Sequence, residues 1–329
     1  MAFRIGRYTG IEEQTFNCEV VTPLFLGGAN PKEAELRPAS IKGMLRFWWR
    51  AVYGSDDLKE MRESEAKIFG DTDSCSHLRV IAPYEEVSKI ENIKGGKKYT
   101  AKSSRGSFNL NIIDYLAFGI CVYNREARGN VYERAHIPPG TKIPITLRYP
   151  KEYQEQVIRS FEAFIRFGGL GAKSRNGFGS LHCASIGKTK FNDLFKGIKP
   201  KSFTAFSEKC KMFTFGDEDT WQNALSDAGL AYRDARLSLE NKHVFESRAH
   251  VAMPIIARGE KNIPGYAQKE RHSKSYFLHV TKTNNGKYRG QIFFMPYKYY
   301  KEDRSNLYNE VCAQMNKRLK EASKQGGQK

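Results

Sequence analysis

Apolar residues recur at helical spacing in residues 37–54, R-P-A-S-I-K-G-M-L-R-F-W-W-R-A-V-Y-G. At about 100° per residue, one side of this segment collects the apolar side chains. They are Ile41, Leu45, Trp48 and Val52, with Met44 at the edge. We therefore predict an amphipathic helix that has Ser40 as its N-cap, ends at Gly54 and buries Trp48 in a core.

A second stripe of the same helix alternates cations with aromatic rings. It comprises Lys42, Arg46, Trp49 and Tyr53, with Arg50 on its flank. Such a stripe suits a polyanion with stackable bases, because cations neutralise phosphates and rings offer flat faces. The pattern alone slightly favours the ordinary alternative, in which the two rings extend the core and the cations are solvated.

Apolar patterns of period 2 and 3.6 predict the other elements and indicate an α+β fold. Strands are expected at 15–26, 78–82, 108–122, 142–149, 181–186, 248–257, 275–283 and 288–297, and helices at 151–167, 219–229 and 308–322. The Asn-Asn-Gly turn at 284–286 predicts a hairpin between the last two strands. The chain is long enough for two domains, and the basic segment 187–202, broken by Gly and Pro, divides it into 1–186 and 187–329.

Residues 168–181, G-G-L-G-A-K-S-R-N-G-F-G-S-L, form a segment that we call the glycine loop. Its glycines permit close backbone approach and free amides facing an anion, Lys173 and Arg175 add charge, and Asn176 adds a neutral donor. A P-loop is disfavoured because Ala172 precedes Lys173-Ser174 and the segment follows a helix. A dinucleotide fingerprint fails for the same positional reason, so ATP, NAD and other cofactors are not expected.

The chain carries a formal net charge of +18, from 54 Lys and Arg against 36 Asp and Glu. This excess favours a negatively charged partner, most often nucleic acid and less often an anionic membrane. Residues 94–105, rich in Lys, Gly and Ser, are compatible with a mobile loop that closes over phosphates or with a disordered insertion. No apolar run reaches membrane-span length, so a soluble cytoplasmic protein without a membrane partner is expected. The scattered cysteines and histidines predict free thiols and no metal site.

The order of motifs resembles the RAMP superfamily of CRISPR proteins, and within it the family of the first Cmr subunit of type III-B effector complexes. The motifs are T-P-L-F-L-G-G-A-N-P, R-P-A-S-I-K-G-M-L-R-F-W-W-R, I-F-G, P-P-G-T and the glycine loop, within residues 16–186. The resemblance implies two ferredoxin-like, RRM-related domains with antiparallel sheets packed against helices, the first of them carrying the glycine loop.

The resemblance also implies a non-catalytic RNA-binding subunit in antiviral defence. Its partners would be guide RNA, target RNA and other Cmr subunits, with contacts near the 3′ end of the guide. Matched by position, the RNA-binding residues would be Lys42, Arg46, Trp49 and Arg50 in the helix, Lys173, Ser174, Arg175 and Asn176 in the loop, and Arg37 ahead of the helix. We therefore expect helix and loop to lie side by side and to present one electropositive surface.

Two other functions remain open at this point. Other RAMP proteins process guide RNA, so a metal-independent endoribonuclease is an alternative, for which His136 and His182 are the candidate acid or base groups. A histidine at either position is more often structural than catalytic. The sequence spacing also identifies no Tyr or Lys that would assist it. A structural adaptor whose positive surface faces acidic sister subunits is the third hypothesis.

Overall fold

The computed structural model describes residues 10–30, 32–83, 88–103, 106–187, 189–241, 243–255 and 262–326. Its strands are β1 Ile11–Val20, β2 Arg79–Ile81, β3 Lys98–Ser103, β4 Gly106–Asn111, β5 Cys121–Asn124, β6 Gly129–Tyr132, β7 Lys142–Pro150, β8 Leu181–His182, β9 Lys211–Glu218, β10 Tyr276–Lys282 and β11 Tyr288–Phe294. Its α-helices are α1 Pro38–Tyr53, α2 Leu58–Phe69, α3 Ile112–Leu116, α4 Gln154–Phe167, α5 Trp221–Leu237, α6 Glu246–Val251, α7 Gly265–Lys269 and α8 Ser305–Gly326. None of the helices in these ranges has the length and apolarity needed to cross a membrane.

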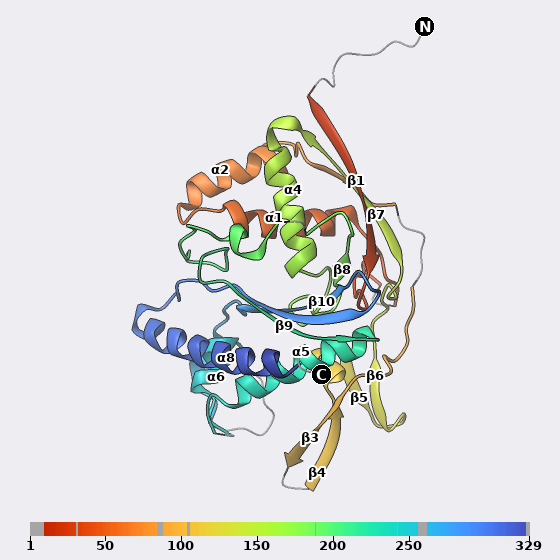
Figure 1. Cartoon of the computed structure of the whole chain (residues 1–329), viewed down its shortest axis with the longest axis vertical. Coiled ribbons are helices and arrows are strands. Elements are labelled where there is room, and N and C mark those ends of the chain that lie inside the picture. Colours follow the sequence, from red (N-terminus) through yellow and green to blue (C-terminus); the bar gives the residue numbers. More distant parts are fainter. Residues whose placement is uncertain are drawn as a thin grey trace.

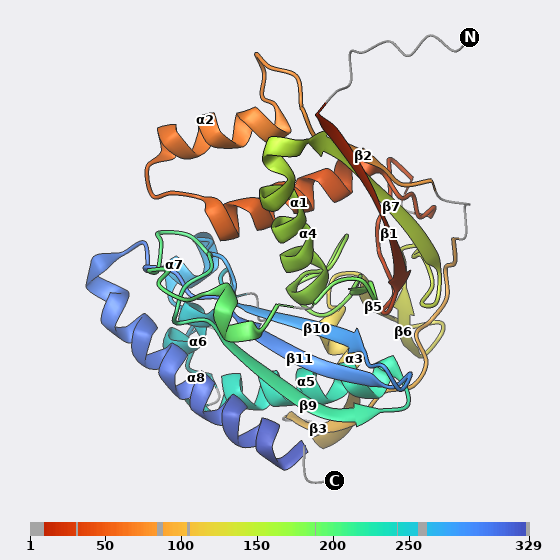
Figure 2. The ribbon, with the colours of Figure 1, turned by 45° about the horizontal axis from the view of Figure 1, so that its top comes forward.

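Two antiparallel sheets enclose one pair of helices (Figures 1 and 2). The first sheet has the order β2-β7-β1-β8 and the second the order β10-β11-β9. Helices α1 and α4 pack between them, and α5 and α8 cover the other face of the second sheet. The predicted α+β class with antiparallel sheets is confirmed, whereas the ferredoxin-like topology of each domain stays a prediction.

Strands β1 and β7 follow the predicted alternation closely. They pair antiparallel from Ile11 opposite Pro150 to Glu19 opposite Lys142. Every second residue of β7 from Ile143 is buried, as are Phe16 and Cys18 of β1. Because successive strand residues face opposite sides, this period places one apolar face of the sheet on α1 and α4.

Two apolar cores lie on the two faces of the second sheet. The core between the sheets contains Trp48 and also Phe206 and Phe293 from the second half of the chain. The core under α5 and α8 contains Phe25 and Phe178 from the first half. Both cores therefore take residues from either side of the segment 187–202, and the division into domains 1–186 and 187–329 stays a prediction.

Four local predictions differ from the structure. The strand expected at 108–122 is interrupted by helix α3, with β4 before it and β5 after it. Ser40 is not the N-cap of α1, because Arg37 holds that position with Pro38 in the first turn. Much of 94–105 is not a loop, since β3 pairs with β4 in a hairpin; residues 104–105 lie outside the described residues. The strand expected at 248–257 is instead helix α6 as far as Val251, and residues 256–257 also lie outside the described residues.

The first turn of helix α6 is satisfied by the carboxylate of Glu240, which lies shortly before the helix in the chain. Glu240 accepts hydrogen bonds from the backbone N–H groups of Ser247, at 2.7 Å, and Arg248, at 3.0 Å. The guanidinium of Arg248 donates to the same carboxylate at 2.9 Å. A helix start gains from an acceptor at its free N–H groups, so this side-chain contact favours a helix over the strand that the apolar pattern suggested.

The glycine loop lies between the chain that leaves β1 and the start of β10. Backbone N–H groups of Ala172 and Gly179 donate to the carbonyls of Phe25 and Pro23, at 2.8 and 3.0 Å. On the other side, the N–H of Leu278 donates to the carbonyl of Arg175 at 3.1 Å. The loop is therefore a wedge that joins the two sheets through its backbone.

Gly179 is the tightest point of this wedge. Its φ is +65°, and a Cβ added there would lie 1.9 Å from the carbonyl oxygen of Leu170. We expect Gly179→Ala to destabilise the fold by about 3 kcal/mol or more, because the new carbon meets backbone that cannot turn away. The free energy of unfolding in urea measures this loss.

The matched control for this substitution is Gly197→Ala. Gly197 has a similar φ of +73° but open space around its Cβ position. The Gly197→Ala variant should lose only about 1–2 kcal/mol of unfolding free energy, which is the cost of a left-handed backbone alone. Equal losses in the two variants would contradict a steric role for Gly179.

His279 on β10 should make the stability of the fold depend on pH. The side chain is 2% exposed and its Nδ1 lies 2.8 Å from the carbonyl oxygen of Gly168, to which it donates as the neutral tautomer. Burial lowers the pKa of His279 from 6.5 to about 4. Between those values the unfolded chain binds a proton that the native chain excludes, so stability falls as pH falls through this window, by up to about 3 kcal/mol.

A His279→Gln variant should lose part of this acid sensitivity. Glutamine can still donate to the Gly168 carbonyl but does not titrate. Urea midpoints measured at pH 7 and pH 4.5 should therefore differ less in the variant than in the parent chain. The same pH dependence in both would show that His279 is not responsible.

Candidate nucleic-acid interface

Trp49 does not lie on an exposed stripe, which corrects the expectation that its ring is available to a base. The residue is 2% exposed, and its ring centroid lies 6.2 Å from that of Phe69 and 6.3 Å from that of Tyr53. Its indole N–H donates to Oε1 of Gln156 at 2.8 Å. Because α2 packs against this side of α1, the ring extends the core, and Trp48 is buried as predicted.

Arg46 and Arg50 share the carboxylate of Glu65 on α2. Arg46 Nε lies 3.2 Å from Glu65 Oε1, and Arg50 Nη2 donates to the same oxygen at 2.8 Å. Arg46 also donates to the carbonyls of Phe69 and Gly70, at 3.1 and 2.9 Å. Hydrogen bonding to Glu65 raises the pKa of Arg50. Since Glu65 is only 7% exposed, the two arginines compensate a carboxylate charge that is largely removed from water.

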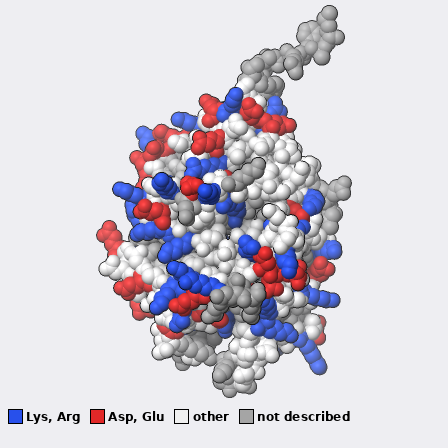
Figure 3. Space-filling view, viewed as in Figure 1, with Lys and Arg blue, Asp and Glu red and all other residues white. Residues whose placement is uncertain are grey.

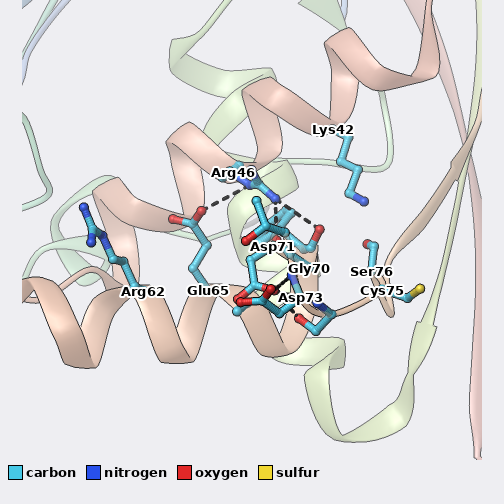
Figure 4. Close-up of a pocket in the computed structure, with 13 residues that line it drawn as sticks. Lys42, Arg46, Arg62, Glu65, Gly70, Asp71, Asp73, Cys75 and Ser76 are labelled. Atoms are coloured by element: carbon cyan, nitrogen blue, oxygen red, sulfur yellow. Dashed lines mark hydrogen bonds and ion pairs between the residues drawn. The ribbon is translucent and has the colours of Figure 1, made fainter.

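A pocket of about 850 Å³ opens between α1, α2 and the turn at 70–76 (Figure 4). Lys42 and Arg46 extend into it from α1, and Arg62 borders it from α2. Burial, and secondly the charge of Arg46, lowers the pKa of Lys42. Among the described residues, no ion pair forms with Lys42 or Arg62. We call this feature the α1–α2 pocket.

Of the acidic residues that line the α1–α2 pocket, Glu65 and Asp71 are already engaged, whereas the Asp73 carboxylate forms no hydrogen bond or ion pair with other described residues. Asp71 Oδ1 accepts from the backbone N–H groups of Asp73 and Ser74 and from the Ser74 hydroxyl, and these hydrogen bonds lower the pKa of Asp71. Arg37, ahead of α1, donates to the carbonyl of Gly27 at 3.1 Å and does not line the pocket. The pocket therefore offers cationic groups to an anion in spite of the carboxylates around it.

The polar residues of the glycine loop have different surroundings. Lys173 has a φ of +61° and is half-buried, and burial together with the charge of Arg134 lowers its pKa. Ser174 is also half-buried. Asn176 uses its side chain for the fold, since Nδ2 donates to the carbonyl of Leu116 at 2.8 Å.

Arg175 joins the glycine loop to both α1 and β10. Its guanidinium lies 5.4 Å from the ring centroid of Phe47 and 4.6 Å from that of Phe277. It also donates to the carbonyl of Lys274 at 2.9 Å. Such placement between two rings holds the cation by cation–π attraction without a carboxylate.

Helix and loop do lie side by side, but they do not form one shared cationic surface. Arg175 contacts the Phe47 side of α1, whereas Lys42 and Arg46 face α2, and no loop residue lines the α1–α2 pocket. The face seen in Figure 3 likewise intersperses basic and acidic side chains. Whether each candidate residue contacts RNA stays a prediction.

Comparisons with known proteins agree on one family. The model of the RAMP superfamily matches residues 17–182. The CRISPR system Cmr subunit Cmr1-2 of Pyrococcus furiosus is 30% identical over 181 residues, which are 51% of this chain and 94% of that protein. Subunit Cmr1-1 of the same organism is 28% identical over 210 residues, 61% of this chain and 56% of that longer relative.

Solved structures show the same fold. The crystal structure of apo Cmr1 from Pyrococcus furiosus superposes with a TM-score of 0.57 at 19% identity, covering 94% of this chain and 97% of that one. A chain in the cryo-EM structure of the type III-B Cmr-beta complex with cognate target RNA, AMPPnP and ssDNA gives a TM-score of 0.51 at 13% identity, covering 93% and 99%. Since the family model spans half of the sequence and Cmr1-2 aligns along nearly all of its own length, the chain belongs to the RAMP superfamily.

Proposed function

We propose that this chain is a non-catalytic RNA-binding subunit of a type III-B CRISPR (Cmr) effector complex that acts in the cytoplasm in antiviral defence. The alignment with Cmr1-2, itself a Cmr subunit, supports membership of such a complex together with other Cmr subunits. The RNA would be guide or target RNA near the 3′ end of the guide. The observation that carries the RNA contact is the α1–α2 pocket, with its cations that lack ion pairs.

Lys42 is the residue best placed to gain from a phosphate in the α1–α2 pocket. Its ammonium is partly desolvated and lies beside the like charge of Arg46, so an entering anion would relieve both costs. Arg62, which forms no ion pair within the described part of the chain, adds a second cation at the other border. Arg46 and Arg50 contribute less, because Glu65 already neutralises part of their charge.

Removing the two unpaired cations tests this proposal. Lys42→Ala combined with Arg62→Ala should weaken binding of single-stranded RNA by the full chain about tenfold. The slope of log affinity against log salt should fall by about 1.4, since each lost phosphate contact contributes about 0.7. Fluorescence anisotropy over a salt series measures both quantities, and Arg46 is left in place to keep Glu65 compensated.

The control variant removes the same net charge elsewhere on α2. Lys59→Ala with Lys67→Ala changes two exposed lysines that do not line the pocket, and affinity should stay within about twofold. Equal losses in both double variants would show that only overall charge matters. A parent chain that binds no RNA would favour the structural adaptor instead.

The alternative endoribonuclease rests on His136 and His182, and the surroundings of both argue for structural roles. His136 is 2% exposed, and its ring centroid lies 5.3 Å from that of Phe25. His182 pairs with Glu19 across β8 and β1, where Glu19 binds Lys142 and Lys282. The presence of these two lysines near His182 keeps the endoribonuclease alternative open, since a neutral histidine beside cations can act in RNA cleavage. The carboxylate of Glu19 already occupies both of them.

RNA incubated with the full chain in EDTA should therefore remain intact. Because Glu19 already pairs with Lys142 and Lys282, these lysines are poorly placed to stabilise a pentacoordinate phosphate. Gel analysis of end-labelled guide repeat RNA measures this, with His182→Ala as the comparison. Specific cleavage by the parent chain that disappears in His182→Ala would overturn the non-catalytic assignment.

A further inference from the structure

Two cysteines face each other at one edge of the first sheet. Strand β8 stands at the end of the order β2-β7-β1-β8, and it pairs with β1 so that Glu19 lies opposite His182. Because the two strands are antiparallel, the same register places Cys18 opposite Cys183, the first residue after β8. Both side chains are buried in the core between the sheets, so they lie on the same face.

The pairing pattern brings these two cysteines into the closest kind of cross-strand position. The N–H of Val21 donates to the carbonyl of Ser180 at 2.8 Å, which marks a hydrogen-bonded pair. Hydrogen-bonded and non-hydrogen-bonded pairs alternate, so Cys18 and Cys183, three steps along, fall on a non-hydrogen-bonded pair with Cα atoms typically about 4.5 Å apart. A disulfide takes Cα separations of about 4.4–6.8 Å, so this position can accept one with little movement of the backbone.

The two thiols already interact. The Cys18 thiol donates a hydrogen bond to the Cys183 sulfur, and this bond is the main reason why the pKa of Cys183 falls from 9.0 to about 6. The Ser185 hydroxyl lies 3.1 Å from the same sulfur and lowers that pKa further. The hydrogen bond and burial together raise the pKa of Cys18. The pair therefore combines a thiolate with a protonated thiol, which are the two states that disulfide formation uses.

The short length of β8 gives a small oxidant access to this buried pair. Strand β8 comprises only Leu181–His182, and a short strand at a sheet edge opens locally far more easily than the whole fold. Such an opening would expose Cys183, whereas Cys18 stays paired with β7 opposite Ile143. The more nucleophilic sulfur is therefore the one that meets the oxidant first.

We propose that Cys18 and Cys183 are a reversible modification site, at which a peroxide forms a cross-strand disulfide that links β8 to β1. The Cys183 thiolate attacks one oxygen of hydrogen peroxide, the O–O bond breaks, and a sulfenic acid and hydroxide result. The Cys18 sulfur then attacks the Cys183 sulfur, and the sulfenic oxygen leaves as water with the Cys18 proton. The hydroxide takes a proton from solvent. The two sulfurs together lose two electrons, and the peroxide is reduced to two molecules of water.

The disulfide would fasten the end of the glycine loop to the first sheet. Residues 168–181 run directly into β8, which pairs with β1 through only two residues. A covalent link between Cys18 and Cys183 also closes most of the first half of the chain into one loop, and this restricts the unfolded chain. Oxidation should therefore stabilise the native fold, whether or not the chain binds RNA.

Peptide mapping of the full chain tests the proposal. The native chain is treated with hydrogen peroxide, the remaining thiols are alkylated in denaturant, and the chain is digested without reductant. The digest should contain a linked pair of peptides that carry Cys18 and Cys183. The Tm of the treated chain should rise by about 5 °C, and dithiothreitol should reverse both changes.

Serine variants separate the roles of the two sulfurs. In Cys18→Ser, oxidation of Cys183 should stop at a sulfenic acid that dimedone traps, whereas in Cys183→Ser the Cys18 side chain should remain a thiol. The matched control is Cys210→Ser. Cys210 lies in the same core, and burial raises its pKa to about 12, so this variant should retain the linked peptides and the rise in Tm.

The peptide map of the parent chain decides the pairing even where a serine variant fails to fold. Absence of the Cys18–Cys183 peptides after treatment overturns the proposal, as does a linkage that forms only when the chain is unfolded in urea. A linkage without a rise in Tm would also contradict it, because the bond would then not hold the edge of the sheet. The RNA-binding function is unaffected by each of these results.

Discussion

The fold depends on the close approach of the glycine loop to backbone on both of its sides. Ala172 and Gly179 donate to the chain that follows β1, and Arg175 accepts from Leu278 at the start of β10. This geometry requires a residue without Cβ at Gly179, where the Leu170 carbonyl occupies the space a side chain would need. Hydrogen bonds between main-chain groups therefore fix the distance between the sheets, and the apolar contacts of α1 and α4 fill the space so defined.

The same loop explains why the excess of positive charge is divided into separate groups. On the α2 side of α1, Glu65 is buried and pairs with two arginines, while Lys42 and Arg62 form no ion pair with any residue that the structure describes. On the other side, Arg175 lies between two aromatic rings, and Lys274 is bound to neutral oxygens. A buried carboxylate thus compensates two arginines of the first group, whereas the cations of the second are held by aromatic rings and neutral oxygens.

Much of the fold followed from periodicity, and the candidate site followed from it only in part. Strong alternation located β1 and β7, helical spacing located α1 and α4, and the Asn-Asn-Gly turn located the β10–β11 hairpin. The predicted exposure of the Trp49 ring was wrong because the spacing along one helix does not reveal that α2 covers that side of α1. Helix α6 was missed because its first turn is satisfied by Glu240, a side chain that lies before the helix and not at its N-cap position.

Cations that the fold brings near the glycine loop also give no signal in the local sequence. Lys274 and Arg236 lie in segments whose sequence resembles ordinary charged surface, and only the fold brings them to Lys173 and Arg175. In the local sequence, Glu65 is likewise indistinguishable from the other acidic residues of the charged helix α2. Sequence patterns report which side of an element is apolar, while charge compensation depends on partners distant in the chain.

The sharing of cores between the two halves of the sequence also affects how the protein is made. The core around Trp48 is incomplete until Phe277, Phe293 and Met295 have been synthesised. Contacts between such distant residues close large loops and form late, so folding on the ribosome must wait for nearly the entire polypeptide. Until then the apolar sides of α1 and α4 stay open to water, which makes the nascent chain a natural client for chaperones.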